Sequence, residues 1–298
     1  MNKERSGFVS IIGMPNSGKS SLVNSLSSGK ISIISPKPQT TRQRIFSIVN
    51  GDGIQIVYSD TPGWILDARY PLHKLMNEKV QESLTDPDVL ILIFDGTKGI
   101  AEHNKMSSLT TGLQVPLLHC INKTDLLSEG EINSLMKELR EKYPKDKIYA
   151  ISALKGRGIE ELRKEIESLI PEHPFYFPDD IISDKPVRFF VSEMIREQIF
   201  HLFEDEIPFS TFVEVTSCKG VDELAEIARI EASIYVAKQS QVPILLGKGG
   251  KMIKELGIRS RKEIEKFLGQ KVFLGLSIKL RKEWRNDGEF IEKSGMLR

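Results

Sequence analysis

The sequence predicts an α/β protein whose mostly parallel sheet is covered by helices, followed by a smaller α+β domain. In the first part of the chain, short apolar runs alternate with amphipathic stretches, as in a parallel sheet with helices on both faces. The second part combines helical stretches with segments that alternate apolar and polar residues, as half-buried antiparallel strands do. We therefore predict a first domain over 1–172, a linker over 173–186 and a second domain over 187–298.

The elements of the first domain follow from the period and the length of its apolar runs. The predicted strands are 8–12, 54–58, 89–94, 116–121 and 148–151. The predicted helices are 20–26, 73–84, 132–142 and 158–169. Because ligands of such folds bind at the carboxyl ends of the strands, motifs at those ends carry the functional prediction.

A proline-rich segment separates the two parts of the chain. Residues 171–186 hold four prolines and show no helical period, which predicts an extended linker. Beyond it, the predicted helices are 187–203 and 251–268, and the predicted strands are 211–217, 228–236 and 272–280.

Composition bounds the class of protein. Of the 298 residues, 40% are hydrophobic and 28% are charged, as in ordinary globular proteins. The two cysteines, Cys120 and Cys218, stand in apolar runs, which predicts small buried side chains rather than a disulfide or a metal site. The longest apolar run, 89–94, is too short to span a bilayer, and the first strand follows the N-terminus with no room for a signal peptide. We therefore expect a cytoplasmic protein.

Charge is distributed unevenly along the chain. Residues 247–298 carry 14 Lys and Arg against 7 Asp and Glu, a net charge of +7, and the remainder carries 28 against 34, a net charge of −6. A basic C-terminal segment on a mildly acidic body predicts an anionic partner for that segment. The alternative interpretation is a solvated charged surface.

Residues 13–20 read Gly-Met-Pro-Asn-Ser-Gly-Lys-Ser, which matches the phosphate-binding loop G-x-x-x-x-G-K-[ST]. The glycines Gly13 and Gly18 let backbone N–H groups point at phosphate oxygens. Lys19 is predicted to reach the β- and γ-phosphates, and the Ser20 hydroxyl is predicted to bind Mg²⁺. The other loop residues predicted to contact a nucleotide are Pro15, Asn16, Ser17 and Ser21.

A second motif, Asp60-Thr61-Pro62-Gly63, follows a predicted strand. Asp60 can hold Mg²⁺ through water, and the N–H group of Gly63 can bond the γ-phosphate. Thr41 is predicted to complete the Mg²⁺ shell in preference to Thr40, and either residue is otherwise part of a surface loop. The predicted metal ligands are Ser20, Thr41 and Asp60, and the predicted catalytic residues are Lys19, Thr41 and Gly63.

A third motif, Asn122-Lys123-Thr124-Asp125, predicts that the nucleotide is a guanine one. The carboxylate of Asp125 can accept from both N–H groups on the edge of guanine, and adenine offers no such pair. Asn122 and Lys123 are expected to support the loop and cover the base. The segment that follows the last predicted strand would approach the guanine O6 with a backbone N–H, and its residues are Ser152, Ala153 and Leu154.

Trp64 occupies the position directly after Gly63, where Ras-like GTPases place a glutamine that orients water. An indole cannot polarise water, so we expect slow GTP hydrolysis or a different device. One such device is a bound monovalent cation such as K⁺, with Asn16 as a ligand. The alternatives are a turn-forming role for Asn16 and a packing role for Trp64.

The tetrapeptide Gly247-Lys248-Gly249-Gly250 fits the G-x-x-G loop with which KH modules clamp about four nucleotides. Its glycines allow the sugar-phosphate backbone to approach closely. The predicted RNA-binding residues are Gly247, Lys248, Gly249, Gly250 and Lys251. The alternative interpretation is a glycine cap at the start of a helix.

Taken together, the chain resembles the Era-type GTPases over essentially its whole length. The matching segments are 13–20, 39–42, 60–63, 122–125, 152–154, 186–193, 195–197, 244–250 and 284–287. Ser17 and Ser21 stand where that family often has Val and Thr, and neither departure removes a ligand. The resemblance implies a P-loop GTPase domain followed by a type II KH domain.

The resemblance also implies a function and partners. It implies a cycle between GTP and GDP with Mg²⁺ and binding of the 3′ end of small-subunit (16S) ribosomal RNA, in which GTP binding orders switch loops and gates RNA binding. It further implies a role in assembly of the 30S subunit and a loose association with the inner membrane. K⁺ is a further expected cofactor, and nothing in the sequence requires an oligomer. The competing interpretation is a GTP-regulated module that docks on a protein or a membrane through its basic segment.

Overall fold

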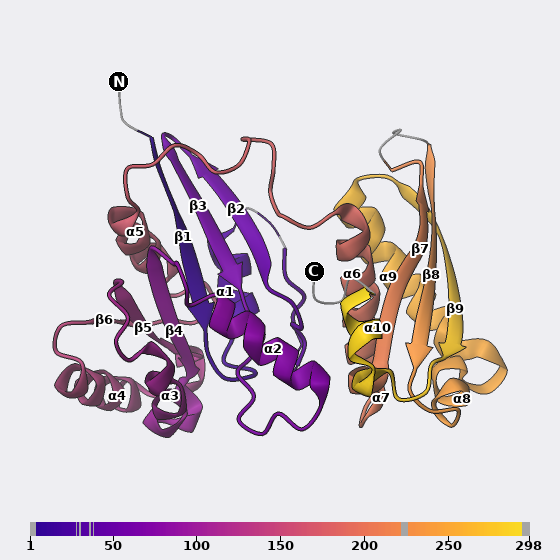
Figure 1. Ribbon diagram of the computed structural model, residues 1–298, viewed down its shortest axis with the longest axis horizontal. Coiled ribbons are helices and arrows are strands. Elements are labelled where there is room, and N and C mark those ends of the chain that lie inside the picture. The colour runs from indigo at the N-terminus through magenta and orange to yellow at the C-terminus, as the bar shows by residue number, and fades with distance from the viewer. Residues whose placement is uncertain are drawn as a thin grey trace. The chain divides into compact units, whose positions relative to one another are not determined.

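The computed structural model describes residues 4–27, 29, 31–35, 37, 39–221 and 226–293 (Figure 1). The chain divides into two compact units, Met1–Arg69 with His73–Asp184, and Lys185–Arg298 with Tyr70–Leu72. Two parts of the sequence analysis lie outside the described residues: the N-terminal residues 1–3 and the last five residues of the basic segment.

A six-stranded sheet forms the centre of the first unit. Its strand order is β2-β3-β1-β4-β5-β6, and only β2 runs antiparallel to its neighbour, which confirms the mostly parallel sheet. The strands are β1 (Arg5–Ile12), β2 (Ile45–Gly51), β3 (Ile54–Asp60), β4 (Val89–Asp95), β5 (Leu117–Asn122) and β6 (Lys147–Ala150).

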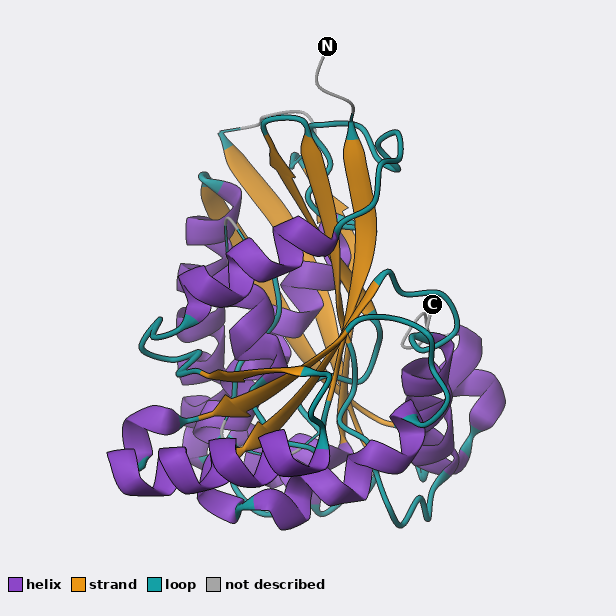
Figure 2. Ribbon diagram, turned by 90° about the vertical axis from the view of Figure 1, so that its left-hand side faces the viewer, coloured by secondary structure: helices purple, strands orange, loops and turns teal. Residues whose placement is uncertain are grey.

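Helices lie beside this sheet (Figure 2, where they are purple). They are α1 (Lys19–Leu26), α2 (Pro71–Glu82), α3 (Ile100–Ser107), α4 (Glu129–Lys142) and α5 (Ile159–Leu169), with short 3₁₀ turns η1 (Gly96–Lys98), η2 (Ser108–Thr110) and η3 (Thr124–Leu126). Odd-numbered β1 residues pack with α1 and α5, whereas Ile12 packs with α2 and α3. Successive strand side chains point to opposite faces, so both faces of the sheet are covered.

The segment predicted as a linker packs along the first unit. The N–H of Ser6 donates to the carbonyl of Pro171 at 3.2 Å, and the N–H of His173 donates to Glu4 at 3.2 Å. Farther along, the buried side chain of Gln55 accepts from the N–H groups of Tyr176 and Phe177. The extended segment thus satisfies its backbone groups on the first unit rather than in water.

A three-stranded sheet forms the centre of the second unit, in the order β7-β8-β9. Strand β7 is antiparallel to β8, as predicted, and β9 is parallel to β8. Helices α6 and α9 pack against each other and against the sheet. The elements are α6 (Val187–Leu202), α7 (Ile207–Ser210), β7 (Thr211–Lys219), β8 (Ile227–Val236), α8 (Gln241–Leu246), η4 (Lys248–Gly250), α9 (Lys251–Leu268), β9 (Lys271–Leu280), η5 (Trp284–Asn286) and α10 (Gly288–Lys293).

Candidate nucleotide site and nucleic-acid cleft

The phosphate-binding loop connects β1 to α1, and its glycines are required by close contacts. A Cβ on Gly13 would lie 2.2 Å from the carbonyl oxygen of Ile93, and a Cβ on Gly18 would lie 2.0 Å from Nδ2 of Asn122. Gly18 also has φ +99°, a conformation that side-chain-bearing residues rarely adopt. The loop can therefore bring its N–H groups to one concave surface.

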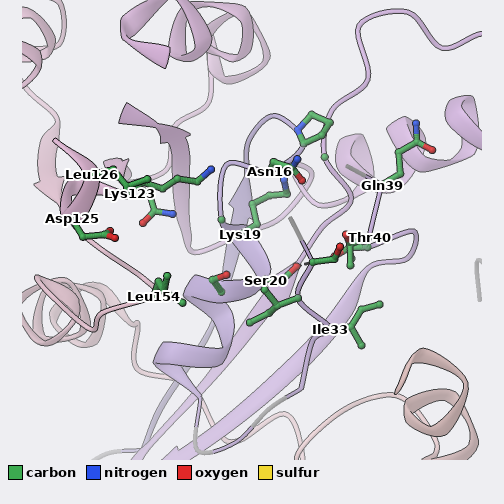
Figure 3. Close-up of a pocket in the computed structure, with 18 residues that line it drawn as sticks. Asn16, Lys19, Ser20, Ile33, Gln39, Thr40, Lys123, Asp125, Leu126 and Leu154 are labelled. Carbon is green, nitrogen blue, oxygen red and sulfur yellow. Dashed lines mark hydrogen bonds between the residues drawn. The ribbon is translucent and has the colours of Figure 1, made fainter. Parts of the chain in front are cut away.

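A cavity of about 380 Å³ opens beside this loop, a size that fits a nucleotide. In Figure 3, Lys123, Asp125, Leu126 and Leu154 lie at one end, and Thr40 and Gln39 lie at the other. Lys19 and Ser20 lie between them. The arrangement separates a base-binding end from a phosphate-binding end.

Hard oxygen ligands meet at the phosphate end, and they fit Mg²⁺. The hydroxyls of Ser20 and Thr41 lie 2.8 Å apart, whereas the Thr40 hydroxyl donates to the carbonyl of Lys37. Asp60 is fully buried, and neither of its carboxylate oxygens has a hydrogen-bond partner among the described residues. Burial raises the pKa of Asp60, and a nearby divalent cation would restore its charged form. The geometry thus favours Thr41 over Thr40.

The side chain of Lys19 is buried against the phosphate-binding loop. Its Nζ donates to the carbonyls of Gly13 at 3.1 Å and Met14 at 2.9 Å. Burial lowers the pKa of Lys19 to about 8, although the charges of Asp60 and Glu102 oppose that shift. Phosphate oxygens close to Nζ would favour the ammonium form strongly.

Gly63 and Trp64 differ in what surrounds them. A Cβ on Gly63 would lie 2.6 Å from the Cα of Pro15, so its close approach to the phosphate loop requires glycine. Trp64 donates its backbone N–H to Gly13 at 3.2 Å, and its ring packs on the apolar cluster that includes Val80. The packing role that the sequence left open for Trp64 is therefore present.

Hydrogen bonds tie the base-binding end to the phosphate loop. The amide of Asn122 donates to the carbonyl of Ser17 at 2.8 Å and accepts from the N–H of Ala153 at 3.0 Å. The Ser152 hydroxyl donates to Asp125 Oδ1 at 2.5 Å, which leaves the other carboxylate oxygen for a ligand. Asn122 therefore joins the guanine motif to the phosphate loop and to the segment 152–154.

Asp95, which the sequence analysis did not single out, holds Lys123 in place. Lys123 Nζ lies 2.6 Å from Asp95 Oδ2, and its backbone adopts a left-handed conformation with φ +63°. Burial opposes ionisation of Asp95, but hydrogen bonds from Lys123 and Thr97 outweigh it and hold the pKa of Asp95 below its ordinary value. The aliphatic stem of Lys123 is thereby positioned at the cavity wall.

The structure gathers the predicted nucleotide-site residues around one cavity. Those that line it are Pro15, Asn16, Gly18, Lys19, Ser20, Ser21, Thr41, Gly63, Asn122, Lys123, Asp125 and Leu154. Those that do not line it are Gly13, Ser17, Asp60, Ser152 and Ala153. Gln39 and Thr40, which the sequence placed in the loop that carries Thr41, also line it, and the lining residues that the sequence analysis missed are Ile33, Ile34, Ser35 and Leu126. Their loop has no regular pattern, except that Leu126 directly follows the guanine motif.

The G-x-x-G loop of the second unit joins α8 to α9. Gly247, with φ 70° and ψ 171°, adopts a glycine-only conformation, and a Cβ there would lie 2.5 Å from Met252. A Cβ on Gly249 would meet open space. Gly250 is the left-handed N-cap of α9, so the capping role that the sequence left open is also present. Lys248 and Lys251 are exposed.

A cleft of about 580 Å³ runs between α9 and β9. Its apolar residues are Ile227, Ile253, Ile258, Val272, Phe273, Leu274 and Leu276, its cationic residues are Lys254, Arg261 and Lys271, and its one carboxylate, Glu265, accepts from the N–H of Val272. An apolar floor with cations beside it suits unstacked bases joined by phosphates. The sequence analysis did not predict these residues, because their helical and strand periods resemble those of ordinary core positions.

Two family profiles match the chain in the same order as its two units. Residues 8–123 match a family described as 50S ribosome-binding GTPase, and residues 206–285 match the KH domain. GTPase Era of Geobacter sp. (strain M21) is 42% identical over 294 residues, which cover 98% of each chain. The chain belongs to the Era family of GTPases.

Other Era proteins extend the similarity. GTPase Era of Elusimicrobium minutum (strain Pei191) is 37% identical over 98% of this chain and 97% of its own. A crystal structure of Era with MgGDPNP and nucleotides 1506–1542 of 16S ribosomal RNA superposes with a TM-score of 0.94 at 35% identity, over 99% of this chain and 100% of the other. A variant of Aquifex aeolicus Era bound to GDP and AlF₄⁻ superposes with a TM-score of 0.93 at 35% identity, over the same shares of the two chains.

Membership of the Era family makes this chain a GTPase with a P-loop domain and a KH domain. Among its described residues, no helix is long and apolar enough to cross a membrane. The part of the chain that the structure describes also holds no cluster of three His, Cys, Asp or Glu ligands.

Proposed function

We propose that this protein is a GTP-hydrolysing switch that binds the 3′ end of 16S ribosomal RNA, that GTP binding gates this RNA binding, and that the protein acts in assembly of the 30S subunit. One observation carries the proposal: the chain joins the guanine-nucleotide cavity to a KH cleft. Its similarity to an Era protein bound to MgGDPNP and 16S nucleotides 1506–1542, over almost the whole length of both chains, supports the same pairing of ligands.

The base-binding end selects guanine. Asp125, held by Ser152, accepts from the two N–H groups of the guanine edge. The exposed side chains of Leu126 and Leu154 are apolar and cover the faces of the ring. Asn122 keeps this end at a fixed distance from the phosphate loop, because its amide joins Ser17 to Ala153.

The phosphate end supports hydrolysis. Ser20, Thr41 and Asp60 would hold Mg²⁺, which neutralises charge on the β- and γ-phosphates when bound. Lys19 stabilises the charge that develops on the leaving β-phosphate, and the N–H of Gly63 bonds the γ-phosphate. The oxygen of a water molecule bonds to the γ-phosphorus as the bond to the bridging oxygen breaks, which gives GDP and phosphate.

Asn16 provides a place for a monovalent cation beside the phosphates. It lines the cavity, and its φ of +65° places it in the left-handed region. Because Trp64 is a packing residue, an added cation is the device that replaces the missing glutamine. K⁺ should stimulate GTP hydrolysis about tenfold over Na⁺ in the native protein but not in Asn16→Ala. Equal stimulation in both proteins would remove Asn16 from this role.

The second unit holds single-stranded RNA. The exposed G-x-x-G loop meets the sugar-phosphate backbone, with Lys248 and Lys251 beside it. The bases enter the cleft between α9 and β9, where apolar side chains contact their faces and Arg261 adds charge. The net charge of +7 over 247–298 favours association with this polyanion.

Gly249 permits a clean test of the RNA site. Its Cβ would meet open space, and its φ of +63° is one that Asp and Asn tolerate better than other residues. Gly249→Asp should weaken binding of an oligonucleotide from the 16S 3′ end about tenfold or more, because its charge repels phosphate. The matched variant Gly249→Asn should weaken it less than about threefold.

The outcome of that experiment separates two functions. Selective loss in Gly249→Asp supports the RNA function, and equal behaviour of all three proteins contradicts the placement of the backbone at this loop. If the native protein does not bind RNA, the result would instead favour a protein or a membrane as the partner of the basic segment. Peripheral association with the inner membrane and the monomeric state stay predictions, to be tested by vesicle sedimentation and by light scattering.

A further inference from the structure

The end of the predicted linker adds to the free edge of β2. The N–H of Ile48 donates to the carbonyl of Ile182 at 3.0 Å, and Ser47 and Ser183 form an antiparallel bridge. The Ser183 hydroxyl donates to the carbonyl of Phe46 at 2.6 Å. The N–H of Phe46 donates to Asp184 Oδ1 at 2.9 Å. We call Ile182, Ser183 and Asp184 the linker latch.

The upstream part of the same segment is fixed as well. The buried Gln55 amide accepts from Tyr176 and Phe177 N–H groups at 2.9 and 3.0 Å and donates to the carbonyl of Phe177 at 2.8 Å. The amide of Asn50 donates to the carbonyl of Asp179 at 2.9 Å. Residues 176–184 therefore follow strands β2 and β3 as one attached segment, because several of their backbone groups are satisfied there.

Strand β2 begins just after the loop that carries Thr41. The hydroxyl of Thr41 lies 2.8 Å from that of Ser20. Phe46, whose backbone groups bond to the latch, lies five positions after Thr41. Between them, Arg44 donates to the Ser59 hydroxyl at 2.7 Å, and its guanidinium lies 4.7 Å from the centroid of the Phe46 ring. A change in the position of Thr41 therefore reaches Phe46 through a short, tightly bonded stretch.

The latch also ends at the boundary between the two units. Asp184 is the last residue of the first unit, and helix α6 begins at Val187. Only Lys185 and Pro186 lie between them, and Pro186 has a fixed φ and restricts the residue before it. Such a short, stiff connection passes a displacement of Asp184 on to α6.

We propose that the linker latch transmits the nucleotide-dependent position of Thr41 and β2 to the second unit. This inference rests on the proposed function, in which GTP gates RNA binding. If residues 182–184 served only to cover the edge of strand β2, backbone hydrogen bonds would be sufficient. Here two of the three hydrogen bonds described above involve the side chains of Ser183 and Asp184, the last two residues before the boundary.

The test measures the distance between the two units without RNA. Dyes are attached to Lys137→Cys in α4 and Lys282→Cys beyond β9, both exposed, with Cys218 replaced by Ser and Cys120 buried. Energy transfer is compared between the GDP state and the state with a non-hydrolysable GTP analogue. It is then compared in Asp184→Ala, in Ser183→Ala and in two controls. Asp184→Asn keeps the acceptor oxygen, and Asp180→Ala removes an exposed carboxylate from the same segment.

We expect the energy transfer of the native protein to differ between the two nucleotide states. The difference should disappear in Asp184→Ala and shrink in Ser183→Ala, and it should persist in both controls. GTP affinity should not change, because neither residue lines the cavity. A native protein without a difference, or an Asp184→Ala protein that keeps it, overturns the proposal. Loss of RNA binding alone would leave this distance unaffected, so failure of the RNA function is distinguishable.

Discussion

Lys19 is a residue of the nucleotide site whose pKa departs from its ordinary value. Burial lowers its pKa to about 8, whereas contact with phosphate raises it, so binding takes up a proton at alkaline pH. Affinity for GDP should therefore be flat below pH 7 and weaken about tenfold between pH 7 and pH 9. Titration of the protein with GDP at several pH values measures this dependence. The buffer contains EDTA, which keeps Mg²⁺ away from Asp60.

Two neighbouring charges control the same titration. Glu102 is buried, and its carboxylate lies 3.0 Å from Lys98 Nζ. The charge of Glu102 raises the pKa of Lys19, whereas the charge of Lys98 lowers it. Lys98→Met should move the alkaline weakening to higher pH, and Glu102→Gln should move it to lower pH. An affinity that does not depend on pH between 7 and 9 would contradict the assignment of Lys19 as the buried phosphate-binding cation.

Asp125 carries the prediction about base specificity. In Asp125→Asn, the side-chain oxygen keeps the hydrogen bond from Ser152, and the NH₂ group then faces the base. Binding of GTP should weaken by about 3 kcal/mol, roughly a hundredfold, because charge-assisted bonds are lost and two donors face each other. XTP, whose ring has a carbonyl at that position, should bind more tightly than GTP. An unchanged preference for GTP would place the base elsewhere.

At the scale of the elements, the sequence predicted the strands that end in motifs and missed β2 and α3. Strand β2 mixes Ser47 and Asn50 with apolar residues, so its period is weak. The Asn50-Gly51-Asp52-Gly53 turn, with Gly53 at φ +70°, was the signal that could have revealed this hairpin. Helix α3 has only eight residues, and two of those it buries are the polar Glu102 and His103. Its sequence therefore lacks the apolar period by which a helix is predicted.

The packing of α3 against β5 creates a pair of buried histidines that sequence spacing does not reveal. His103 Nε2 lies 2.8 Å from His119 Nδ1, and His119 Nε2 lies 2.9 Å from Asp146 Oδ2. Burial, with a smaller effect of His119, lowers the pKa of His103 to about 3. The unfolded chain therefore binds a proton at His103 below about pH 6.5, and the folded chain does not until about pH 3.

Acid should therefore destabilise the first unit through His103. Between these two values the unfolded state binds more protons, so the free energy of unfolding falls as pH falls, by up to about 1.4 kcal/mol per pH unit. His103→Gln keeps a polar side chain and should flatten this slope between pH 6 and pH 4.5. Urea unfolding at several pH values measures it, with exposed His201→Gln as the matched variant. An identical slope in native protein and His103→Gln would contradict the buried neutral histidine.

At the scale of the whole molecule, the sequence predicted two functional parts but not how the chain connects them. The prolines of 171–186 predicted an extended linker, and the structure places the residues up to Asp184 in the first unit. Attachment of that linker to β2 depends on Gln55, Ser183 and Asp184, whose side chains meet partners more than 100 positions away. Such long-range polar contacts leave no periodic signal, so the latch appears only in the folded structure.

We expect the nucleotide cavity to control the RNA cleft. The most direct measurement is the affinity of the native protein for an oligonucleotide from the 3′ end of 16S ribosomal RNA, with Mg²⁺ and either GDP or a non-hydrolysable GTP analogue. We predict binding about tenfold tighter with the analogue, within the usual range of coupling between two sites. Equal affinities in the two states would contradict the switch, even if the protein hydrolyses GTP and binds the RNA.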